Sequence, residues 1–582
     1  MFNEINNMKN KILPVFLILA ILITGGSIKK LIVRADNATT GVTVGNTVPA
    51  FNNGYESHED PASDATTPTD VGDAVTFKGT ATDANGDQWK LLICATAGTT
   101  DVTCTGTVIC NTAVAVNSNT EASCTYTALV GDAQSKDWYG YACDSVGCSG
   151  ESHKVDSSGP PFKVNHSPAF SVYADNGPKG PVTTITWTTT ASDPDDDTAQ
   201  DTVSLYVCKA ADFTGSVCGG GGTWCFDTGK ASNPTCGTTT PRPDGDYTAY
   251  GYVIDSHGFA SVDTTQGTNS SPTVSNSSPS ITESSILFTN GNDSTPLALT
   301  VEQDQTTGFK VTFTVTDGNS CLKKGGGNEI ASAFINVRMS QKAQTACDAT
   351  EEYDANDCYP DAYATWNPSC SQTGSCGGDT DTDIEWTCTF PLQYHADPTV
   401  TGTPKAAYKW ISAVQATDDN SATTGLVDGN TYAPAMDKFM SYDLNTASIS
   451  YGTVAPNNDS SQQTTIVEAT GNVGLDENLS GGIAAGKGMC VTDYPTCSGS
   501  YINTEQQKYN LTTGLGWEGA GATALAYSPA ESELNCAKTT VTGTPATKDT
   551  YWYLRVPLGQ AVGSYTGSNI IGGKVDNETY GS

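Results

Sequence analysis

The sequence predicts an all-β protein made of tandem, disulfide-stapled β-sandwich domains after an N-terminal signal segment. Three features predict this class. Short stretches of alternating apolar and polar residues recur along the 582 residues, Gly (59) and Pro (27) are abundant, and 19 cysteines gather in groups. Alternation puts every second side chain on one face of a strand, while Gly and Pro favour turns. Long helices are therefore not expected.

Residues 1–35 are predicted to be a secretory signal. Two lysines precede an apolar run that ends at Ile23, and Val33 and Ala35 precede a cleavage point at Asp36, as in exported proteins. An uncleaved membrane anchor is the alternative, because basic residues also follow the run. We expect export by the Sec pathway to the cell surface or beyond, with membrane contact only through this segment if it stays attached.

The charge balance excludes one class of partner. The chain carries 28 Lys and Arg against 63 Asp and Glu, a formal charge of -35. Such a surface repels nucleic acid and anionic lipid and attracts metal cations. Acidity can also serve solubility alone.

The cysteines indicate an oxidising compartment and local bridges. Six lie between Cys94 and Cys148, four between Cys208 and Cys236, and six between Cys321 and Cys388. Even numbers imply bridges within each group. The last group, Cys490 to Cys536, holds three, so one cysteine is either free and buried or available to a partner chain.

An internal repeat sets the predicted domains. Three segments open alike, with "NTVPAF", "NHSPAF" and "NSSPSI", and a Pro is well placed before an edge strand. Each opening precedes an alternating strand, an acidic turn, a second apolar strand and a later strand that ends in acid. The predicted domains are repeat 1 (46–163), repeat 2 (164–274), repeat 3 with insertions (275–444) and a divergent β-sandwich module (445–582).

Comparison of the repeats identifies one disulfide. Repeats 2 and 3 lack a cysteine at both positions that correspond to Cys143 and Cys148, and only "DSVG" separates the two in repeat 1. They can therefore face each other across a hairpin turn at bridging distance. The pairing of the other cysteines stays open.

The repeat has a family resemblance. "TATDANGD" followed by an apolar strand, with "N-x-x-P" ahead and an "A-x-D" turn behind, resembles the immunoglobulin-like and cadherin-like repeats of microbial secreted or cell-surface proteins. The resemblance covers roughly residues 46–444. It implies that calcium at a domain end stiffens the hinge to the neighbouring domain. Pro- and Ser-rich linkers suit semi-extended spacers, so we expect a rod.

The acidic turns are candidate calcium sites. In an immunoglobulin-like sandwich, the turn after the second strand lies at the same end as the turn between the last two strands. Oxygen ligands at alternate positions in one loop plus a carboxylate from another suit Ca²⁺, although Asp and Asn also simply form good turns; the third turn carries fewer acids. The candidate ligands are Asp83, Asn85, Asp87 and Asp144 in repeat 1, Asp193, Asp195, Asp197 and Asp255 in repeat 2, and Asp317, Asn319, Asp418 and Asp419 in repeat 3.

No catalytic motif accompanies these turns. The five histidines show no paired metal spacing, and no G-x-S-x-G elbow occurs. The predicted function is a non-enzymatic structural or adhesive surface protein whose partners are other surface proteins, further copies of itself or glycans. The alternative is a secreted carbohydrate-binding protein, which needs exposed aromatic side chains. The candidates are Trp138, Trp187, Trp224, Trp366 and Trp517.

Overall fold

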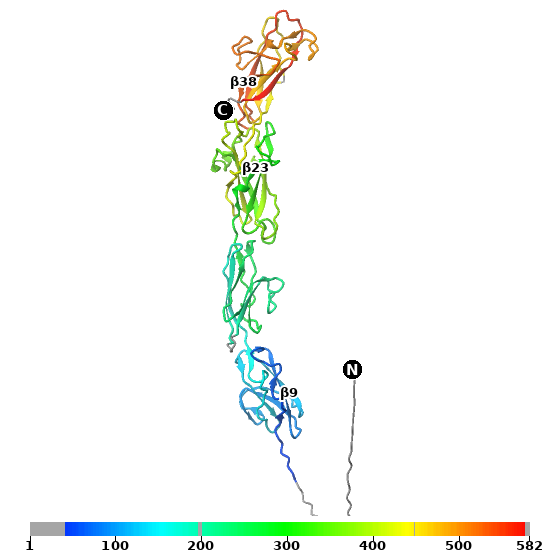
Figure 1. The fold of residues 1–582 in the computed structure, drawn as a ribbon, viewed down its shortest axis with the longest axis vertical. Coiled ribbons are helices and arrows are strands. Elements are labelled where there is room, and N and C mark those ends of the chain that lie inside the picture. Colours follow the sequence, from blue (N-terminus) through cyan, green and yellow to red (C-terminus); the bar gives the residue numbers. More distant parts are fainter. Residues whose placement is uncertain (1–40, 196–200, 447, 577–582) are drawn as a thin grey trace, which may run out of the picture. The chain divides into compact units, whose positions relative to one another are not determined.

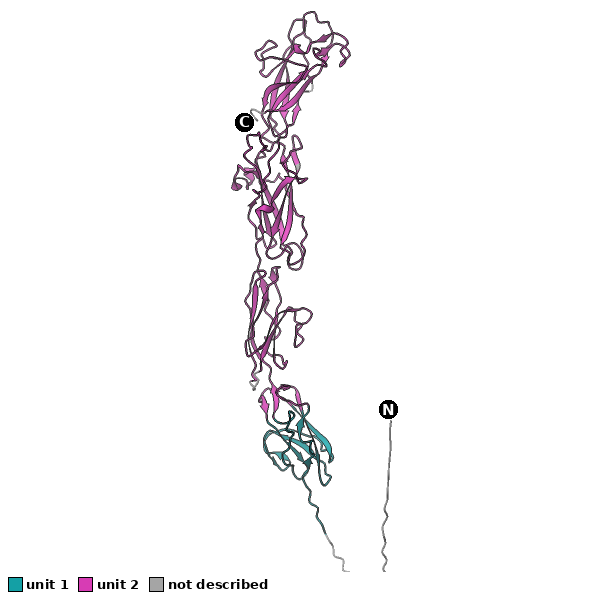
Figure 2. Cartoon of the chain, in the orientation of Figure 1, with its two compact units in different colours: residues 1–60, 76–126, 137–160 teal, residues 61–75, 127–136, 161–582 magenta. Residues whose placement is uncertain are grey.

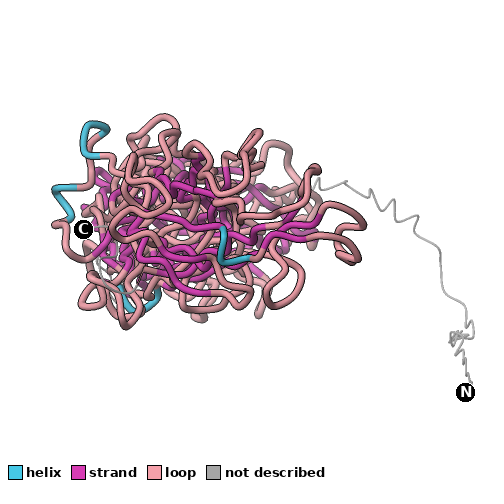
Figure 3. Tube along the Cα trace, turned by 90° about the horizontal axis from the view of Figure 1, so that it is seen from above, coloured by secondary structure: helices cyan, strands magenta, loops and turns pink. Residues whose placement is uncertain are grey.

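The structure, a computed structural model, describes residues 41–195, 201–446 and 448–576. Strands account for 41% of it and helices for 2%, and Figure 3 shows that strands and loops dominate the trace. The predicted all-β class is confirmed, with tandem immunoglobulin-like sandwiches and nine disulfides. The predicted signal segment lies outside the described residues. Within them, no helix has the length and hydrophobicity needed to cross a membrane.

The chain divides into two compact units, which Figure 2 colours separately. Unit 1 contains the described residues 41–60, 76–126 and 137–160, and unit 2 contains residues 61–75, 127–136 and those from 161 onward. Each unit is described by itself.

Unit 1 holds most of repeat 1. Its main sheets have the strand orders β1-β4-β2, with β9 also on β4, and β11-β5-β8. Phe77 and Trp138 pack edge to face with ring centroids 4.9 Å apart, and the Trp138 indole donates to Glu59 at 2.8 Å. The strands of repeat 1 in this unit, of which β4 and β9 begin or end in unit 2, are β1 (Ala50–Phe51), β2 (His58–Glu59), β4 (Ala74–Thr82), β5 (Lys90–Cys94), β6 (Thr99–Thr100), β7 (Thr103–Cys104), β8 (Val108–Asn111), β9 (Thr120–Thr127) and β11 (Tyr139–Cys143).

Unit 2 begins with a small sheet that includes part of the first Pro- and Ser-rich linker, residues 156–168. β12 (Phe162–Asn165) pairs antiparallel with β10 (Ser135–Lys136) and parallel with β3 (Thr69–Asp70). Alternating burial supports this pairing, because Phe162 and Val164 are buried. The part of the linker at Phe162–Asn165 is therefore an extended strand that is hydrogen-bonded into a sheet.

Repeat 2 packs two sheets of order β13-β14-β17 and β16-β15-β19-β20, beside a β18-β21 pair. Every second residue of β14 and β15 points inward, so that Ile185, Trp187, Leu205 and Val207 share one core. Its strands are β13 (Ala169–Asp175), β14 (Thr184–Ser192), β15 (Val203–Cys208), β16 (Thr223–Lys230), β17 (Cys236–Thr239), β18 (Gly245–Asp246), β19 (Tyr250–Asp255), β20 (Thr268–Asn269) and β21 (Thr273–Val274).

Repeat 3 has the largest core. One sheet has the order β22-β24-β28-β27, with β23 also on β24, and the other has the order β26-β25-β29-β30. Val311 and Phe313 from the first sheet meet Val337 and Val414 from the second. Its elements are β22 (Ser280–Ile281), η1 (Glu283–Ser285), β23 (Leu287–Asn290), β24 (Gln305–Thr316), β25 (Ile330–Met339), η2 (Gln344–Ala346), η3 (Thr350–Glu352), β26 (Cys358–Tyr359), β27 (Ser369–Gln372), β28 (Asp383–Gln393), β29 (Trp410–Asp418) and β30 (Val427–Asp428).

The last module has three sheets, of order β31-β32-β39-β36-β37, β38-β33-β41 and β35-β34-β40. Trp552 and Leu554 on one side of β39 are buried, and so is Tyr553 on the other side. Its elements are β31 (Tyr442–Leu444), β32 (Gln463–Ala469), β33 (Leu475–Gly481), β34 (Met489–Cys490), β35 (Tyr501–Ile502), η4 (Thr504–Gln506), β36 (Gln507–Asn510), β37 (Thr523–Ala524), β38 (Ala530–Cys536), β39 (Thr547–Leu554), β40 (Thr566–Gly567) and β41 (Asn569–Val575).

The disulfides all lie within the predicted groups. The predicted Cys143–Cys148 bridge is present, and repeats 1 and 2 share the same pairing order. Cys536 is the cysteine left over; it is free and buried, and burial raises the pKa of its thiol to about 11. The other bridges are Cys94–Cys104, Cys110–Cys124, Cys208–Cys218, Cys225–Cys236, Cys321–Cys376, Cys347–Cys358, Cys370–Cys388 and Cys490–Cys497.

Each repeat opens with Pro directly before an edge strand, as expected. Pro49, Pro168 and Pro279 precede β1, β13 and β22, and each of these strands is the end strand of its sheet. Because an edge strand has one side free of ladder hydrogen bonds, the missing amide of Pro costs nothing there. The first residue of each of these edge strands pairs with the residue directly before the acidic turn, so the openings and the acidic turns lie at the same end of each sandwich.

Candidate cation sites

The opening Asn of each repeat binds the Asp of the last turn. This contact joins the first residue of "N-x-x-P" to the acid of the "A-x-D" turn, and it recurs in all three copies. The Asn Nδ2 to Asp Oδ2 distances are 2.9 Å for Asn46–Asp144, 3.0 Å for Asn165–Asp255 and 2.8 Å for Asn276–Asp418. The two sequence signatures thus form one structural unit that closes the end of each sandwich.

The first Asp of each acidic turn caps its own loop. Its Oδ1 accepts the backbone amide two residues later, which is the usual Asx turn. The pairs are Asn85 to Asp83 at 2.7 Å, Asp195 to Asp193 at 2.9 Å and Asn319 to Asp317 at 2.8 Å. The Oδ2 atoms of Asp83, Asp193 and Asp317 are buried and accept no hydrogen bond. A buried carboxylate oxygen without a partner is costly, so each loop contains a buried oxygen that a cation could contact.

Repeat 1 gathers the fewest acids. Asp83 and Asp144 are buried, whereas Asn85 and Asp87 are exposed. Asn85 uses its Oδ1 to accept from the amide and hydroxyl of Thr47. Within the described residues, this end of repeat 1 contains no group of three acids close enough to hold one ion. Calcium binding by Asp83, Asn85, Asp87 and Asp144 therefore stays a prediction.

Repeat 2 brings three carboxylates together. Ligand atoms of Asp193, Asp195 and Asp201 all lie within 4.8 Å of one another. Asp201 was not a predicted ligand; it lies two residues before β15, whose Val203 pairs with Asp255. The predicted ligand Asp197 lies outside the described residues.

Mutual repulsion marks the repeat 2 site. Burial, together with the charges of Asp255, Asp195 and Asp201, raises the pKa of Asp193 to about 7. Two imidazoles flank the site: His166 Nδ1 lies 2.8 Å from Asp195 Oδ1 and His257 Nδ1 lies 3.3 Å from Asp201 Oδ1. The buried Oδ1 of Asn165 has no hydrogen-bond partner. The site is thus a set of oxygen atoms that a cation would neutralise.

Repeat 3 has the most deeply buried cluster. Ligand atoms of Asp317, Glu329 and Asp418 lie within 4.8 Å of one another, and the three residues are 0%, 0% and 1% exposed. Neither carboxylate oxygen of Glu329 has a hydrogen-bond partner. Glu329 also belongs to a second group with Asp244 and Asp419. One buried side chain therefore serves two neighbouring carboxylate clusters.

The electrostatics of this cluster favour a positive ligand. Burial raises the pKa of Glu329 to about 8, and the further contributions come from four other carboxylates, those of Asp419, Asp244, Asp317 and Asp418. Burial likewise raises the pKa of Asp317 to about 6. Buried carboxylates that share a small volume must be protonated or bind a cation.

Asn319 holds neighbouring backbone segments in position and adds no charge to the cluster. Its Nδ2 donates to the carbonyls of Ser275 and Arg242, each at 3.2 Å, and its Oδ1 accepts the amide of Ser277. All the polar atoms of this side chain are therefore used by backbone. Asn319 ties the opening segment to the acidic turn beside the cluster.

Glu329 and Asp244 were not among the ligands predicted from the sequence. Glu329 directly precedes β25, whose Ile330 pairs with Asp418, and Asp244 comes from the loop before β18 of repeat 2. The pairing of strand ends across the sheet is the signal that could have found Asp201 and Glu329, because they lie two residues and one residue before the partner of the last-turn Asp. No local motif points to Asp244.

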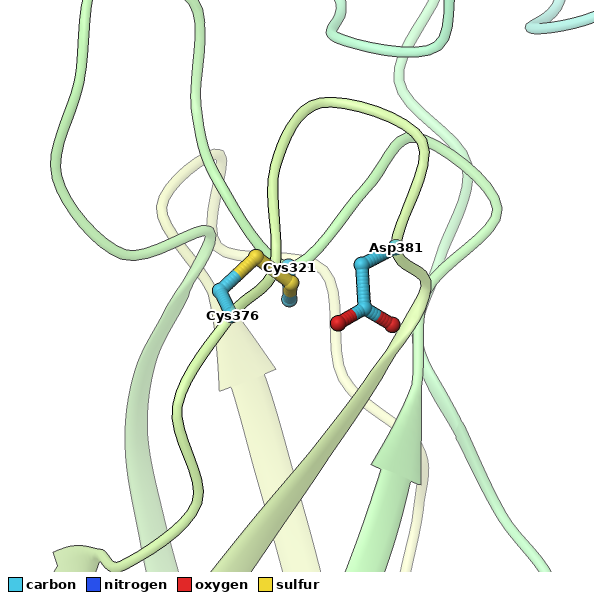
Figure 4. A group of neighbouring side chains, drawn as sticks. All are labelled: Cys321, Cys376 and Asp381. Carbon is cyan, nitrogen blue, oxygen red and sulfur yellow. A yellow bond between two sulfur atoms is a disulfide. The ribbon is translucent and has the colours of Figure 1, made fainter.

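A fourth group of potential ligand atoms is not a metal site. Cys321, Cys376 and Asp381 lie together in repeat 3, but the two sulfur atoms form a disulfide, as Figure 4 shows. A metal-binding cysteine is a thiolate, and neither sulfur is available in that form. Asp381 instead accepts the amide of Gly377 at 2.9 Å.

The residues of repeats 2 and 3 fit calcium better than a transition metal. The clusters offer carboxylate and amide oxygens, which are the ligands of hard cations, whereas zinc sites use Cys and His. Ca²⁺ takes about six to eight oxygens; each cluster offers three carboxylates, and the Oδ1 of Asn165 is a buried oxygen without a partner at the repeat 2 end. The Oδ1 of Asn276 is also buried without a partner.

The five tryptophans do not form a sugar platform. Trp138, Trp187 and Trp366 are buried. Trp224 and Trp517 are half-buried, and cationic groups lie over their rings. The Nζ of Lys209 lies 5.0 Å from the Trp224 ring centroid. The Nζ of Lys508 and the Cζ of Arg555 lie 3.7 and 3.8 Å from the Trp517 ring centroid. Core packing and cation–π contacts therefore account for these side chains.

Comparison with known proteins identifies no family. No protein-family profile and no curated protein matches the chain. Among solved structures it is similar to a marsupial T cell receptor (9% identity, 60% of this chain and 93% of that chain, TM-score 0.24). It is also similar to an α-L-rhamnosidase from Dictyoglumus thermophilum (9%, 69% and 48%, TM-score 0.13) and to a Corynebacterium diphtheriae protein described as membrane anchored (11%, 66% and 91%, TM-score 0.13).

Proposed function

We propose that this protein is an exported, non-enzymatic structural or adhesive protein of the cell surface, and that repeats 2 and 3 bind Ca²⁺. Calcium would hold the loops at the end of each sandwich in one arrangement and so stiffen the junction with the preceding domain. The disulfides, which suit an oxidising extracellular environment, and the acidic composition support this proposal.

Glu329 carries the calcium part of the proposal. Glu329 is fully buried, neither of its carboxylate oxygens has a hydrogen-bond partner, and the charges of four other carboxylates act on it. A buried carboxylate in such a place is costly without a counter-ion. A cation between Asp317, Glu329 and Asp418 would remove that cost.

Calorimetric titration tests the calcium part. The purified chain, first treated with EDTA, is titrated with CaCl₂ and in parallel with MgCl₂. We expect Ca²⁺ to bind and to raise the melting temperature, and Mg²⁺ to bind more weakly, because Mg²⁺ demands a tighter octahedral shell. Absence of Ca²⁺ binding at millimolar concentration would remove the metal from the proposal.

A second experiment separates a structural role from an adhesive one. A subunit of a lattice or fibre should polymerise, whereas an adhesin should stay monomeric and bind a foreign surface. Electron microscopy and sedimentation with Ca²⁺ or EDTA distinguish the two. Small-angle scattering under the same conditions tests whether Ca²⁺ stiffens the chain.

Carbohydrate binding is a second candidate because of one aromatic patch. Tyr206, Phe213 and Tyr252 stack on the outer side of the β15 sheet, with Phe213 and Tyr252 centroids 4.8 Å apart. Phe226 stacks on Tyr206 and is 64% exposed. Flat aromatic faces of this kind suit sugar rings. A glycan array with the wild type and the Phe226→Ala variant tests this candidate, and signals that the substitution leaves unchanged would exclude the patch.

A further inference from the structure

The last module contains a cavity without charged residues, beside residues 448–456, which belong to no strand. The cavity has a volume of about 860 Å³ and is lined by residues of 448–456 and 560–569, together with side chains from the sheets behind them. Ile449, Tyr451, Leu554 and Ile571 provide much of its apolar wall. A volume of this size lies in the range of ligand-binding cavities, about 300–1,000 Å³.

Backbone groups at this cavity lack strand partners. Among the described residues, 448–454 make no backbone–backbone hydrogen bond and belong to no strand. β41 pairs with β33 on one side only. Its unpaired edge is a template for another strand. Within this strand the carbonyl of Ile571 accepts the Tyr442 hydroxyl at 2.9 Å.

A buried amide also points to a missing partner. Gln507 lines the cavity and is 2% exposed. Its Oε1 accepts from the Tyr451 hydroxyl at 3.1 Å and from Asn569 at 3.0 Å, whereas its Nε2 donates to nothing. A carbonyl of an entering chain would satisfy this donor, since buried amides are normally hydrogen-bonded.

The chain contains a segment whose chemistry fits this cavity. Residues 41–45, "GVTVG", precede the Asn46–Asp144 contact and make no hydrogen bond within the described part of the chain. Val42 and Val44 are 86% and 75% exposed, although Val-Thr-Val alternation favours a strand. In Figure 1 this stretch is the dark blue thread that leaves the β9 domain.

Charge also matches the segment to the cavity. None of the cavity-lining residues is charged, in a chain of net charge -35, and residues 41–45 are uncharged as well. Burying a charge in such a site would be costly. The predicted cleavage before Asp36 would place the segment near a free amino terminus, which can enter the cavity beside residues 448–456.

We propose that residues 41–45 of one copy insert as a β-strand into this cavity of a second copy. Val42 and Val44 face the apolar wall, and the backbone pairs with the free edge of β41, so that copies join head to tail. This is strand addition, in which main-chain hydrogen bonds supply affinity and alternate side chains fill pockets. The inference rests on the proposed structural function, because it supplies the contact by which the protein assembles.

Sedimentation velocity and disulfide trapping with the purified mature chain test this inference. The wild type should form concentration-dependent oligomers, and Val42→Asp together with Val44→Asp should weaken association at least 100-fold. Val155→Asp, at a 97% exposed valine elsewhere in unit 1, should leave it unchanged. For trapping, a Val44→Cys chain mixed with an Ile449→Cys chain should yield a cross-linked dimer on oxidation, and neither chain alone should.

Three results would overturn the inference. The first is full association of the double Asp variant, and the second is absence of the mixed cross-link in oligomers of the wild type. The third is an intramolecular cross-link in a single chain that carries both cysteines, which would mean that the segment fills its own cavity. Calcium titration of the double Asp variant separates the two proposals, because loss of assembly with unchanged Ca²⁺ binding leaves the calcium proposal standing.

Discussion

Replacing Glu329 with Gln should remove most of the stabilisation that Ca²⁺ gives to repeat 3. Gln keeps the shape of the side chain but replaces a carboxylate with a neutral amide. The substitution should have opposite effects in the two conditions. Without Ca²⁺ the variant should be at least as stable as the wild type, because one of several buried like charges is gone and the new amide can donate to Asp317 or Asp418.

The magnitude follows from mass action. A ligand at about 100 times its dissociation constant stabilises the folded state by about 2.7 kcal/mol. In a domain of about 150–250 residues, each kcal/mol moves the melting temperature by about 2–4 °C, so the wild type should gain roughly 5–10 °C. Loss of a carboxylate that serves both clusters should reduce that gain to a small fraction.

Differential scanning calorimetry in EDTA and in millimolar Ca²⁺ measures both effects. The matched control is Glu351→Gln, which makes the same chemical change at an exposed glutamate of the same repeat and should leave the Ca²⁺-induced gain intact. The reasoning is refuted if Glu329→Gln retains the full gain, or if its EDTA form melts well below that of the wild type.

Two other predictions concern stability. Burial raises the pKa of Glu477, which is 1% exposed, from 4.5 to about 7; the folded last module therefore holds this proton more tightly than the unfolded chain. Its stability should fall by up to about 3 kcal/mol between pH 4.5 and 7 and change little above, and Glu477→Gln should flatten this loss in urea titrations at several pH values. Replacing both cysteines of Cys321–Cys376 (separation 55) by Ser should cost about 4 kcal/mol, against about 2 kcal/mol for Cys143–Cys148 (separation 5). Equal losses in denaturant titrations would argue against the loop-entropy explanation.

Sequence periodicity was enough to predict the fold class, and the Pro-containing motifs were enough to predict the opening segment of each repeat. Alternation in β14 and β24 is a local property of the backbone, so it survives in the structure whatever surrounds it. The Pro before β1, β13 and β22 is local in the same sense, because it needs only an edge position. The grouping of cysteines was also predictable, since short separations favour bridges inside one domain.

The candidate sites were only partly predictable. The acidic turns were visible as Asp and Asn at alternate positions, and the loop that carries Asp255 or Asp418 could be paired with them from general sandwich topology. The turns alone would rank repeat 3 lowest, yet it holds the most buried cluster. The clusters of repeat 3 include Glu329 and Asp244, and neither residue belongs to a sequence motif.

The sequence by itself determined the strands, the turns and the excess of negative charge, because these depend on neighbours in the chain and on composition. Only the tertiary structure decided which carboxylates share a site, how the cysteines other than Cys143 and Cys148 pair, and where a sheet edge stays open. The reason is physical: Asp244, Glu329 and Asp419 approach one another only through strand register and the meeting of two repeats, and the cost of burying their charges together exists only once the chain is folded.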